Sequence, residues 1–307
     1  MTTMISFEDG ERNLDWLGLT EALAAGHRLP RAEIADVFLY RDPDTLLNRS
    51  AWIDGLGIAV KAATVFPRNP DKGLPMVGGA VNLFDDATGG LTAIVDFHLV
   101  TKWKTAGDSL LAARRLARPD SRRILIVGAG TVAASLHQAY SAAFPQAGFA
   151  VWNRSPDKAR AFADERGIDF APDLAEAVAG ADIVTCATMS TDPVIHGEWL
   201  QPGTHLDLIG AYRPDMREAD DDALIRSRVF VDSYATTLGH IGELKIPLEI
   251  GTIRREDVIA DYYEPDLFRR ETDQEITLFK NGGGAHLDLM TARFILDRWQ
   301  GGEPARD

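Results

Sequence analysis

Residues 123–133 read RILIVGAGTVA, and this stretch decides the fold of half the chain. The apolar run from Ile124 to Val127 is typical of a parallel strand that is buried on both faces. A glycine turn follows, and the spacing of apolar residues over 131–143 then predicts a helix. Further strands are predicted at 149–152, 183–186, 205–209 and 229–231, with a helix at 156–166. Strands and helices in alternation predict an α/β fold with a doubly wound parallel sheet of the Rossmann type.

The part of the chain before Pro119 has a different pattern. Residues 108–117 (DSLLAARRLA) carry apolar residues at helical spacing, and Pro119 ends this helix. Residues 58–65 have a strand-like pattern, and a turn is predicted at 85–90 (DDATGG). We therefore place a domain boundary near Arg118 and Pro119 and expect an antiparallel or mixed sheet before it.

Composition limits the class of protein. Of the 307 residues, 45% are hydrophobic and 25% are charged, which suits a globular chain of two domains. The formal net charge of -14 argues against a nucleic-acid partner, although local positive charge still allows a small anionic substrate. No apolar run is long enough to cross a bilayer and the start is acidic, so we expect a cytoplasmic protein without a membrane partner. Cys186 is interpreted as a core residue, and no Cys/His spacing indicates a metal site.

The glycine turn has the form G-x-G-x-x-A that is typical of dinucleotide-binding domains. Gly128 permits the tight turn, Gly130 lets the backbone approach a pyrophosphate, and Ala133 allows close packing of the helix. The helix N-terminus offers N–H groups to the anion. A pair of glycines alone would indicate only a turn, but the strand before it and the helix after it favour a cofactor site. The predicted contacts are Gly128, Ala129, Gly130, Thr131 and Val132.

The end of the second predicted strand indicates which dinucleotide binds. An NAD enzyme normally carries an acid there for the ribose 2′-hydroxyl, whereas this chain has Asn153, Arg154 and Ser155, followed by Lys158. Arg154 can bind a 2′-phosphate through two N–H groups, so we predict that NADP(H) is preferred over NAD(H). The alternative is that Arg154 and Lys158 are solvated surface residues.

A third loop follows the predicted strand at 183–186. Topology places Thr188, Met189 and Ser190 where a Rossmann loop passes beneath the nicotinamide ribose. We include these three residues among the predicted cofactor contacts.

Seven short stretches carry a family resemblance: GLGIAVK at 55–61, TVFP at 64–67, KTA at 104–106, WNRS at 152–155, GAYRPDMREAD at 210–220, VDS at 231–233 and FKNGGGAHLD at 279–288. In this order and spacing they resemble the ornithine cyclodeaminase/mu-crystallin family, from about Leu46 to the end of the chain. The resemblance implies an NAD(P)H-dependent oxidoreductase whose closing helix returns to the first domain. We therefore expect an NADP-binding Rossmann domain at 119–280. A second α+β domain, for substrate binding and dimerisation, is expected from 1–118 and 281–307.

The resemblance also implies a homodimer built through the split N-terminal domain. The substrate is expected in the cleft between the domains, facing the nicotinamide.

Three cationic residues are candidates for binding a substrate carboxylate. Lys61 lies in an apolar strand and is costly to bury without an anion, so we expect the substrate to be its partner; the alternative is a lysine that faces outward. Lys104 stands where the family usually has Arg, so a group that could bind a carboxylate or phosphate through two N–H donors is replaced by a single ammonium charge. Arg49 replaces a usual Met and is expected to supply a missing charge, unless it is simply exposed. Thr105, which follows Lys104 in the same motif, is counted among the cofactor contacts.

Tyr212 bears on the type of reaction. In ornithine cyclodeaminases a catalytic Asp lies two residues before the proline that matches Pro214, and here that position is Tyr212. Deamination needs a base near the amine, whereas reduction needs only a protonated C=N bond held against the nicotinamide. Tyr212 is expected to donate or relay the proton, or to pack against the ring. Asp232 and Asp288 are interpreted as capping or exposed acids.

These residues favour an NADPH-dependent reductase of a small cyclic ketimine carboxylate, such as 1-pyrroline-2-carboxylate or 1-piperideine-2-carboxylate, with Lys61 and Tyr212 as catalytic residues. Two alternatives stay open. One is an ornithine or lysine cyclodeaminase or an alanine dehydrogenase of the same family, and the other is a non-catalytic, crystallin-like NADP-binding protein. Lys61 and the glycine turn favour an enzyme, and the absence of Asp at position 212 favours the reductase.

Overall fold

The computed structural model describes residues 2–302, which fall into two compact units. Unit 1 contains 2–104 and 283–302, and unit 2 contains 105–282. The sequence-based boundary at Arg118 and Pro119 differs from this division because helix α3 (Phe97–Leu116) begins earlier than predicted. Its C-terminal part belongs to unit 2, where the Asp108 carbonyl accepts a hydrogen bond from the Tyr262 hydroxyl at 2.7 Å.

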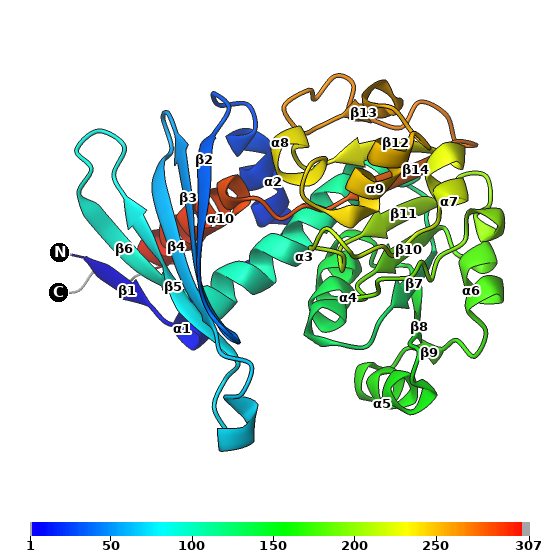
Figure 1. Cartoon of the computed structure of the whole chain (residues 1–307), viewed down its shortest axis with the longest axis horizontal. Coiled ribbons are helices and arrows are strands. Elements are labelled where there is room, and N and C mark those ends of the chain that lie inside the picture. Colours follow the sequence, from blue (N-terminus) through cyan, green and yellow to red (C-terminus); the bar gives the residue numbers. More distant parts are fainter. Residues whose placement is uncertain (1, 303–307) are drawn as a thin grey trace. The chain divides into compact units, whose positions relative to one another are not determined.

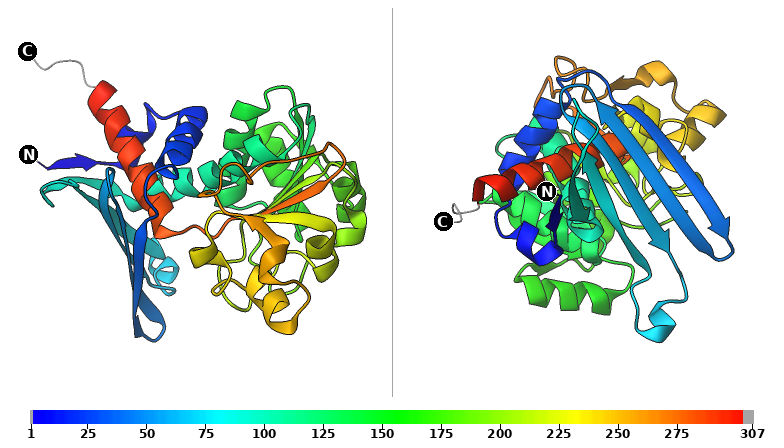
Figure 2. Two further views of the ribbon diagram at one scale, coloured as in Figure 1. Left: turned by 90° about the horizontal axis from the view of Figure 1, so that it is seen from above. Right: turned by 90° about the vertical axis from the view of Figure 1, so that its left-hand side faces the viewer.

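Unit 1 is built on a six-stranded mixed sheet, as the sequence predicts. The strand order is β1-β6-β5-β4-β3-β2, with β1 parallel to β6 and all other neighbours antiparallel. The strands are β1 (Thr3–Ile5), β2 (Glu33–Arg41), β3 (Asp44–Ile53), β4 (Gly57–Val65), β5 (Val77–Phe84) and β6 (Leu91–Asp96). The helices are α1 (Phe7–Glu11), α2 (Trp16–Gly26), the short η1 (Pro70–Lys72) and α10 (Ala285–Gly302). Helix α10 packs against β3 and β4 (Figures 1 and 2).

Strand register places a row of side chains on the face of this sheet that α10 covers. Asp36 pairs with Arg49, Arg49 with Lys61, and Lys61 with Val81. Directly paired residues share a face, and neighbours along a strand point to opposite faces. The register of the sheet therefore brings Arg49 and Lys61 together beneath α10.

Unit 2 is a doubly wound sheet of eight parallel strands, which confirms the predicted fold class (Figure 1). The order is β13-β12-β14-β11-β10-β7-β8-β9. The strands are β7 (Arg123–Val127), β8 (Gly148–Trp152), β9 (Asp169–Phe170), β10 (Ile183–Cys186), β11 (His205–Leu208), β12 (Ser227–Val231), β13 (Val258–Ala260) and β14 (Ile276–Lys280). The helices are α4 (Thr131–Ala143), α5 (Pro156–Arg166), α6 (Leu174–Gly180), η2 (Gly197–Trp199), α7 (Asp221–Arg226), α8 (Tyr234–Thr237), α9 (Gly242–Ile250) and η3 (Arg255–Asp257).

Strand order identifies the ligand-binding edge of unit 2. The chain leaves β7 toward β8 on one side, and β10 pairs with β7 on the other side. Ligands of open α/β sheets bind at the carboxyl ends of the strands where the order reverses in this way. The loops after β7 and β10 are therefore the expected cofactor loops.

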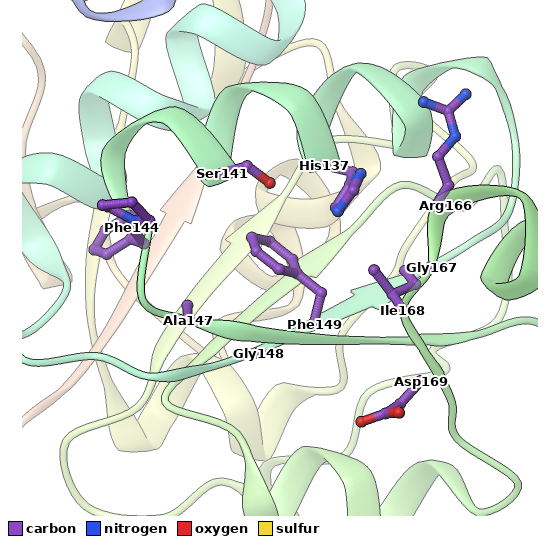
Figure 3. A pocket seen from close by; sticks show the side chains of 11 residues that line it. His137, Ser141, Phe144, Ala147, Gly148, Phe149, Arg166, Gly167, Ile168 and Asp169 are labelled. Atoms are coloured by element: carbon purple, nitrogen blue, oxygen red, sulfur yellow. The ribbon is translucent and has the colours of Figure 1, made fainter.

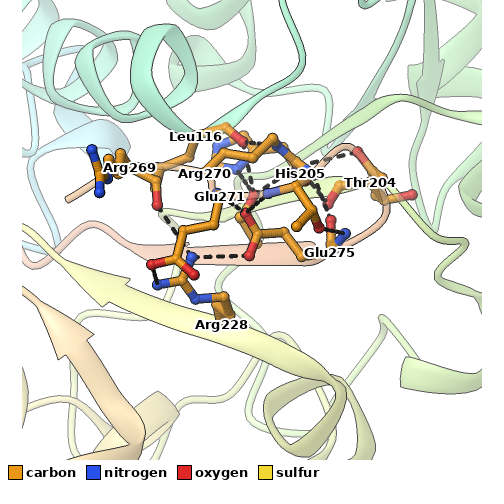
Figure 4. Close-up of polar contacts among 11 residues, drawn as sticks. Leu116, Thr204, His205, Arg228, Arg269, Arg270, Glu271 and Glu275 are labelled. Atoms are coloured by element: carbon orange, nitrogen blue, oxygen red, sulfur yellow. Dashed lines mark hydrogen bonds and ion pairs between the residues drawn. The ribbon is translucent and has the colours of Figure 1, made fainter. Parts of the chain in front are cut away.

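At the amino ends of the strands of unit 2, Arg270 binds main-chain oxygens of three segments that precede strands (Figure 4). Its guanidinium donates to the carbonyls of Leu116 and Glu275, both at 2.6 Å, and to that of Gly203 at 3.1 Å. Arg228 pairs with Glu275 at 2.9 Å in the same cluster. Within residues 2–302, no helix has the length and apolar character needed to cross a membrane.

Candidate active site

The glycine turn after β7 has the geometry that a bound pyrophosphate requires. Gly128 has a φ of 117°, and a Cβ atom on it would lie 2.8 Å from the Ala187 carbonyl oxygen, so no larger residue fits. A Cβ atom on Gly130 would meet nothing within 4 Å, and Thr131, which opens α4, is exposed. Ala133 is fully buried against the sheet. The turn therefore leaves the N-terminus of a 13-residue helix open to an anion.

The turn directly after β8, residues 153–155, carries Arg154 and no acid, and Asp157 and Lys158 follow in the first turn of α5. Arg154 and Lys158 are exposed, while Asn153 and Ser155 are half-buried. The Asn153 amide donates to the Ser155 carbonyl at 3.2 Å, which holds the turn just before α5. The Arg154 guanidinium is a group that could pair with a phosphate on the ribose.

The loop after β10 is held by a residue that sequence reasoning missed. Thr188 is half-buried, and its N–H and hydroxyl both donate to the Glu218 carboxylate, at 2.7 and 2.9 Å. Met189 is exposed and Ser190 is half-buried. Glu218 belongs to the stretch 210–220, but no local pattern shows that its carboxylate turns back toward Thr188.

Tyr212 lies in the segment that joins β11 to α7, and its side chain is 60% exposed. The Arg213 guanidinium lies 5.9 Å from the centre of its ring. Thr105 is half-buried in α3, and its carbonyl accepts a hydrogen bond from the Asn281 amide at 3.0 Å. Both residues belong to unit 2.

Unit 1 holds a separate cluster of buried charges around Asp288. The Lys61 ammonium is only 5% exposed and donates to the Thr101 hydroxyl and to Asp288 Oδ1, both at 3.0 Å. It also lies 4.6 Å from the centre of the Phe97 ring, a cation–π contact. A lysine in this apolar strand thus has a protein anion as its partner, where the sequence suggested the substrate.

Lys104 lies on the other side of Asp288. Its ammonium donates to the Gly283 carbonyl at 2.7 Å and lies 3.4 Å from Asp288 Oδ1. Burial, assisted by the charges of Lys61 and Arg49, lowers the pKa of Lys104 to about 8. Burial alone would raise the pKa of Asp288, but the neighbouring cations lower it, so this carboxyl is ionised.

Arg49 completes the cluster from β3. Its guanidinium binds Asp36 through two nitrogens, at 2.8 and 3.0 Å, and donates to the Gly283 carbonyl at 2.9 Å. The five charged side chains of this anion cluster, Arg49, Lys61, Lys104, Asp36 and Asp288, carry one formal net positive charge. Lys61, Lys104 and Asp288 are buried, whereas Arg49 and Asp36 are partly exposed, and surplus positive charge beside buried groups favours an anionic ligand.

The two acids that were interpreted as capping or exposed residues are both buried. Asp288 is 1% exposed because it faces the sheet from the first turn of α10, where it is needed as the counter-charge of two lysines. Asp232 is fully buried, and it accepts from the Ser233 N–H and the Thr237 hydroxyl, both at 2.7 Å. Exposure was therefore wrong for both residues. The partners of Asp288 are remote in sequence, whereas those of Asp232 are local and lie around the short helix α8.

A pocket of about 340 Å³ lies in unit 2 but away from the glycine turn. His137 and Ser141 point from α4 toward Phe149 on β8, and Arg166 lies at the end of α5 (Figure 3). The pocket is at the start of β8, while the glycine turn follows the end of its parallel neighbour β7. It is therefore not the cofactor site. Among residues 2–302, no three His, Cys, Asp or Glu side chains are grouped in a way that would hold a metal ion.

Comparisons with known proteins agree with this geometry. The chain is 52% identical to Delta(1)-pyrroline-2-carboxylate reductase of Paracoccus denitrificans, over 95% of each chain. The structure matches Delta(1)-pyrroline-2-carboxylate reductase of Thermococcus litoralis in complex with NADH and L-proline, with a TM-score of 0.88, 27% identity and 98% of each chain covered. It also matches an archaeal alanine dehydrogenase dimer with bound NAD, with a TM-score of 0.88 and 28% identity over 98% and 96% of the two chains. The sequence model of the ornithine cyclodeaminase/mu-crystallin family matches residues 53–303, and the chain belongs to this family.

Proposed function

We propose that this chain catalyses the NADPH-dependent reduction of a small cyclic ketimine carboxylate, such as 1-pyrroline-2-carboxylate or 1-piperideine-2-carboxylate, to a cyclic amino acid. The observation that carries the proposal is the anion cluster of unit 1, with its one surplus positive charge. A substrate carboxylate would neutralise that charge. The likeness to the pyrroline-2-carboxylate reductase of Paracoccus denitrificans supports an imine acid as the ligand.

Lys104 and Arg49 are the proposed carboxylate-binding residues. An ammonium group has three N–H donors, and Lys104 directs two of them toward the Gly283 carbonyl and Asp288. The third is assigned to the substrate. The Lys61 ammonium donates hydrogen bonds to Thr101 and Asp288 and faces the Phe97 ring. Its proposed role is to add positive charge and to hold Asp288 in place.

The cofactor is assigned to unit 2, where NADPH would supply the hydride. The turn at Gly128 would hold the pyrophosphate, and residues 188–190 would lie at the nicotinamide ribose. Arg154, with Lys158 nearby, is assigned to the 2′-phosphate. The two solved relatives are described with NADH and NAD, so the proposed preference for NADP(H) rests on the turn at Arg154 alone.

Tyr212 is the proposed source of the proton that the imine nitrogen needs. It stands where the resemblance places the catalytic Asp of a cyclodeaminase. A tyrosine carries a hydroxyl that can donate its proton, whereas the carboxylate of an Asp is an acceptor only, so Tyr212 suits donation to an imine nitrogen better than removal of a proton from an ammonium group. This favours reduction over deamination.

A second copy of this chain is the proposed partner of the open face of the unit 1 sheet. On β2, the apolar residues Val37 and Leu39 point away from α10 and are exposed, Leu39 by 58%. Exposed apolar patches of this kind mark interfaces. The archaeal relative is described as a dimer.

Light scattering coupled to gel filtration tests this interface. The wild-type protein should have twice the mass of one chain, and Leu39→Asp should have the mass of a single chain. A wild-type monomer would refute the interface.

The reaction is tested by following NADPH oxidation with a panel of cyclic ketimine acids and of 2-keto acids supplied with amines. Consumption with a five- or six-membered cyclic ketimine acid is expected, with no ammonia released from ornithine. Proline formed from ornithine with matching ammonia would support a cyclodeaminase. NADPH binding without turnover on any member would support a non-catalytic binding protein.

A further inference from the structure

The Glu218 carboxylate joins two loops at the carboxyl edge of the unit 2 sheet. The side chain is fully buried. Its Oε1 atom accepts from the N–H and the hydroxyl of Thr188, at 2.7 and 2.9 Å. Its Oε2 atom accepts from the N–H groups of Gly210 and Ala211, at 2.6 and 3.2 Å. One side chain thus receives four hydrogen bonds from two separate loops.

These two loops lie next to the glycine turn. Thr188 follows β10 and Gly210 follows β11, and β10 lies between β7 and β11 in the sheet. The loop backbones are in close contact, because a Cβ atom on Gly210 would lie 1.6 Å from the Thr188 carbonyl oxygen. The Ala187 carbonyl in turn lies close to Gly128. Tyr212 follows Ala211 directly, so the arrangement that Glu218 fixes also sets the start of the segment that carries Tyr212.

We propose that Glu218 is a positioning residue for the nicotinamide half of the cofactor, which it serves by holding the Thr188 loop and the backbone before Tyr212 in one arrangement. This inference rests on the proposed function, because it assumes that the nicotinamide binds at this edge. Glu218 itself, being buried beneath the loops, acts through Thr188 and Ala211.

A second buried acid fixes Glu218 in turn. The Glu243 carboxylate accepts from the backbone N–H groups of Glu218 and Ala219, at 2.7 and 3.0 Å, and is fully buried. Lys280, also buried, donates to the Leu208 carbonyl at 2.9 Å, and its charge opposes the rise in pKa that burial imposes on both glutamates. Glu243 therefore fixes the main chain at Glu218, and the Glu218 side chain in turn fixes the two loops.

A carboxylate is the group that this position requires. All four partners of Glu218 are donors, and an ionised carboxylate is an acceptor only. A glutamine of the same shape keeps one oxygen, and its NH₂ group would face either the Thr188 donors or the two N–H groups of the other loop. Glu218→Gln therefore releases one loop while it changes the volume of the side chain very little.

The test compares two ligands that differ only in the nicotinamide half. NADPH spans the whole site, whereas 2′-phospho-ADP keeps the adenosine, the 2′-phosphate and the pyrophosphate and lacks both the nicotinamide and its ribose. By calorimetry, Glu218→Gln should weaken NADPH about ten- to a hundredfold, the range expected for charge-assisted hydrogen bonds, and leave 2′-phospho-ADP unchanged. Arg154→Ala should weaken both ligands. Asp207→Asn is the matched control, since Asp207 is a fully buried acid of β11 that accepts from Tyr140 and Thr185 and touches neither loop; it should leave both affinities unchanged.

The outcomes separate the possible failures. Equal weakening of the two ligands by Glu218→Gln, or no weakening of NADPH, would overturn the positioning role. A wild-type protein that binds neither ligand would refute the proposed cofactor site instead. If Glu218→Gln does not fold, Glu218→Asp gives the same comparison, because its shorter side chain still accepts hydrogen bonds but cannot reach both loops. NADPH should again lose affinity selectively, and equal losses for the two ligands would reject the proposal.

Discussion

The two candidate anion sites of this protein are built in opposite ways. In the anion cluster of unit 1, the cations Lys61 and Lys104 are buried and share one buried carboxylate, Asp288. The proposed phosphate site of unit 2 offers backbone N–H groups near Gly130 and the side chain of Arg154, both of which are exposed to water.

Comparison of the two sites indicates that cations buried in an anion-binding site, such as Lys61 and Lys104, need an anion of the protein as counter-charge. An isolated ammonium in a protein interior is costly, so Asp288 stabilises the folded state in which both lysines are buried. An exposed cation has no such requirement, because its charge is hydrated until the ligand arrives. Substitutions in the buried site should therefore affect stability and binding together, whereas those in the exposed site should affect binding alone.

The largest effect is expected from Asp288→Asn, which removes the counter-charge and leaves two ammonium groups buried. Breaking a buried ion pair on one side costs about 3–5 kcal/mol. The free energy of unfolding, measured in urea at pH 7, should fall by this amount. Arg154→Ala is the control and should change it by less than about 0.5 kcal/mol, because surface changes are nearly neutral. Equal losses in the two variants would abolish the distinction between the sites.

A smaller but specific effect is expected from Lys61→Met, which removes the surplus positive charge of the anion cluster. Lys104 still pairs with Asp288, so the variant should fold. Its kcat/KM for a cyclic ketimine acid should fall about ten- to a hundredfold, and the Kd of NADPH should stay the same. Steady-state kinetics and a fluorescence titration measure the two quantities. Wild-type turnover in this variant would reduce Lys61 to a structural role.

Arg154→Ala tests the exposed site in the same way. Loss of a charge-assisted contact to the 2′-phosphate should weaken NADPH about ten- to a hundredfold and leave NADH nearly unchanged. The KM for the ketimine acid should not move at saturating cofactor. If the wild-type protein binds NADH as tightly as NADPH, the turn after β8 does not select the cofactor.

The smallest effect concerns pH and Lys104. Because its pKa is lowered to about 8, Lys104 loses its charge as the pH rises above 8, and kcat/KM for a carboxylate substrate should then fall about tenfold per pH unit. Lys104→Arg restores a group that stays charged, so this variant should keep its kcat/KM above pH 8. If kcat/KM of the Lys104→Arg variant falls above pH 8 as it does in the wild-type protein, the loss has a cause other than Lys104. The free energy of unfolding should change in the opposite direction. Between pH 8 and the ordinary lysine pKa, Lys104 is protonated in the unfolded chain but not in the folded protein, so stability rises with pH in this window.

The sequence predicted unit 2 well because its signals are local. The strand at 123–127, the helix at 131–143 and the helix at 156–166 were each predicted from residues that are adjacent in the chain. Lys61 could be chosen from its apolar strand. Its partner Asp288 could not, since 227 residues separate them and the Asp lies in the first turn of a helix, where capping is the common role. Glu218 was missed for the same reason, because its four donors come from loops that only the sheet brings together.

Helix α10, which supplies Asp288, is synthesised after the whole of unit 2. At elongation rates of about 5–20 residues per second, roughly ten to fifty seconds pass between the emergence of Lys61 and that of its counter-charge. Unit 2 is continuous in the chain and can collapse around its own sheet in that interval. Until α10 emerges, the sheet of unit 1 lacks its covering helix and Lys61 stays hydrated, so we expect unit 1 to complete its folding after unit 2.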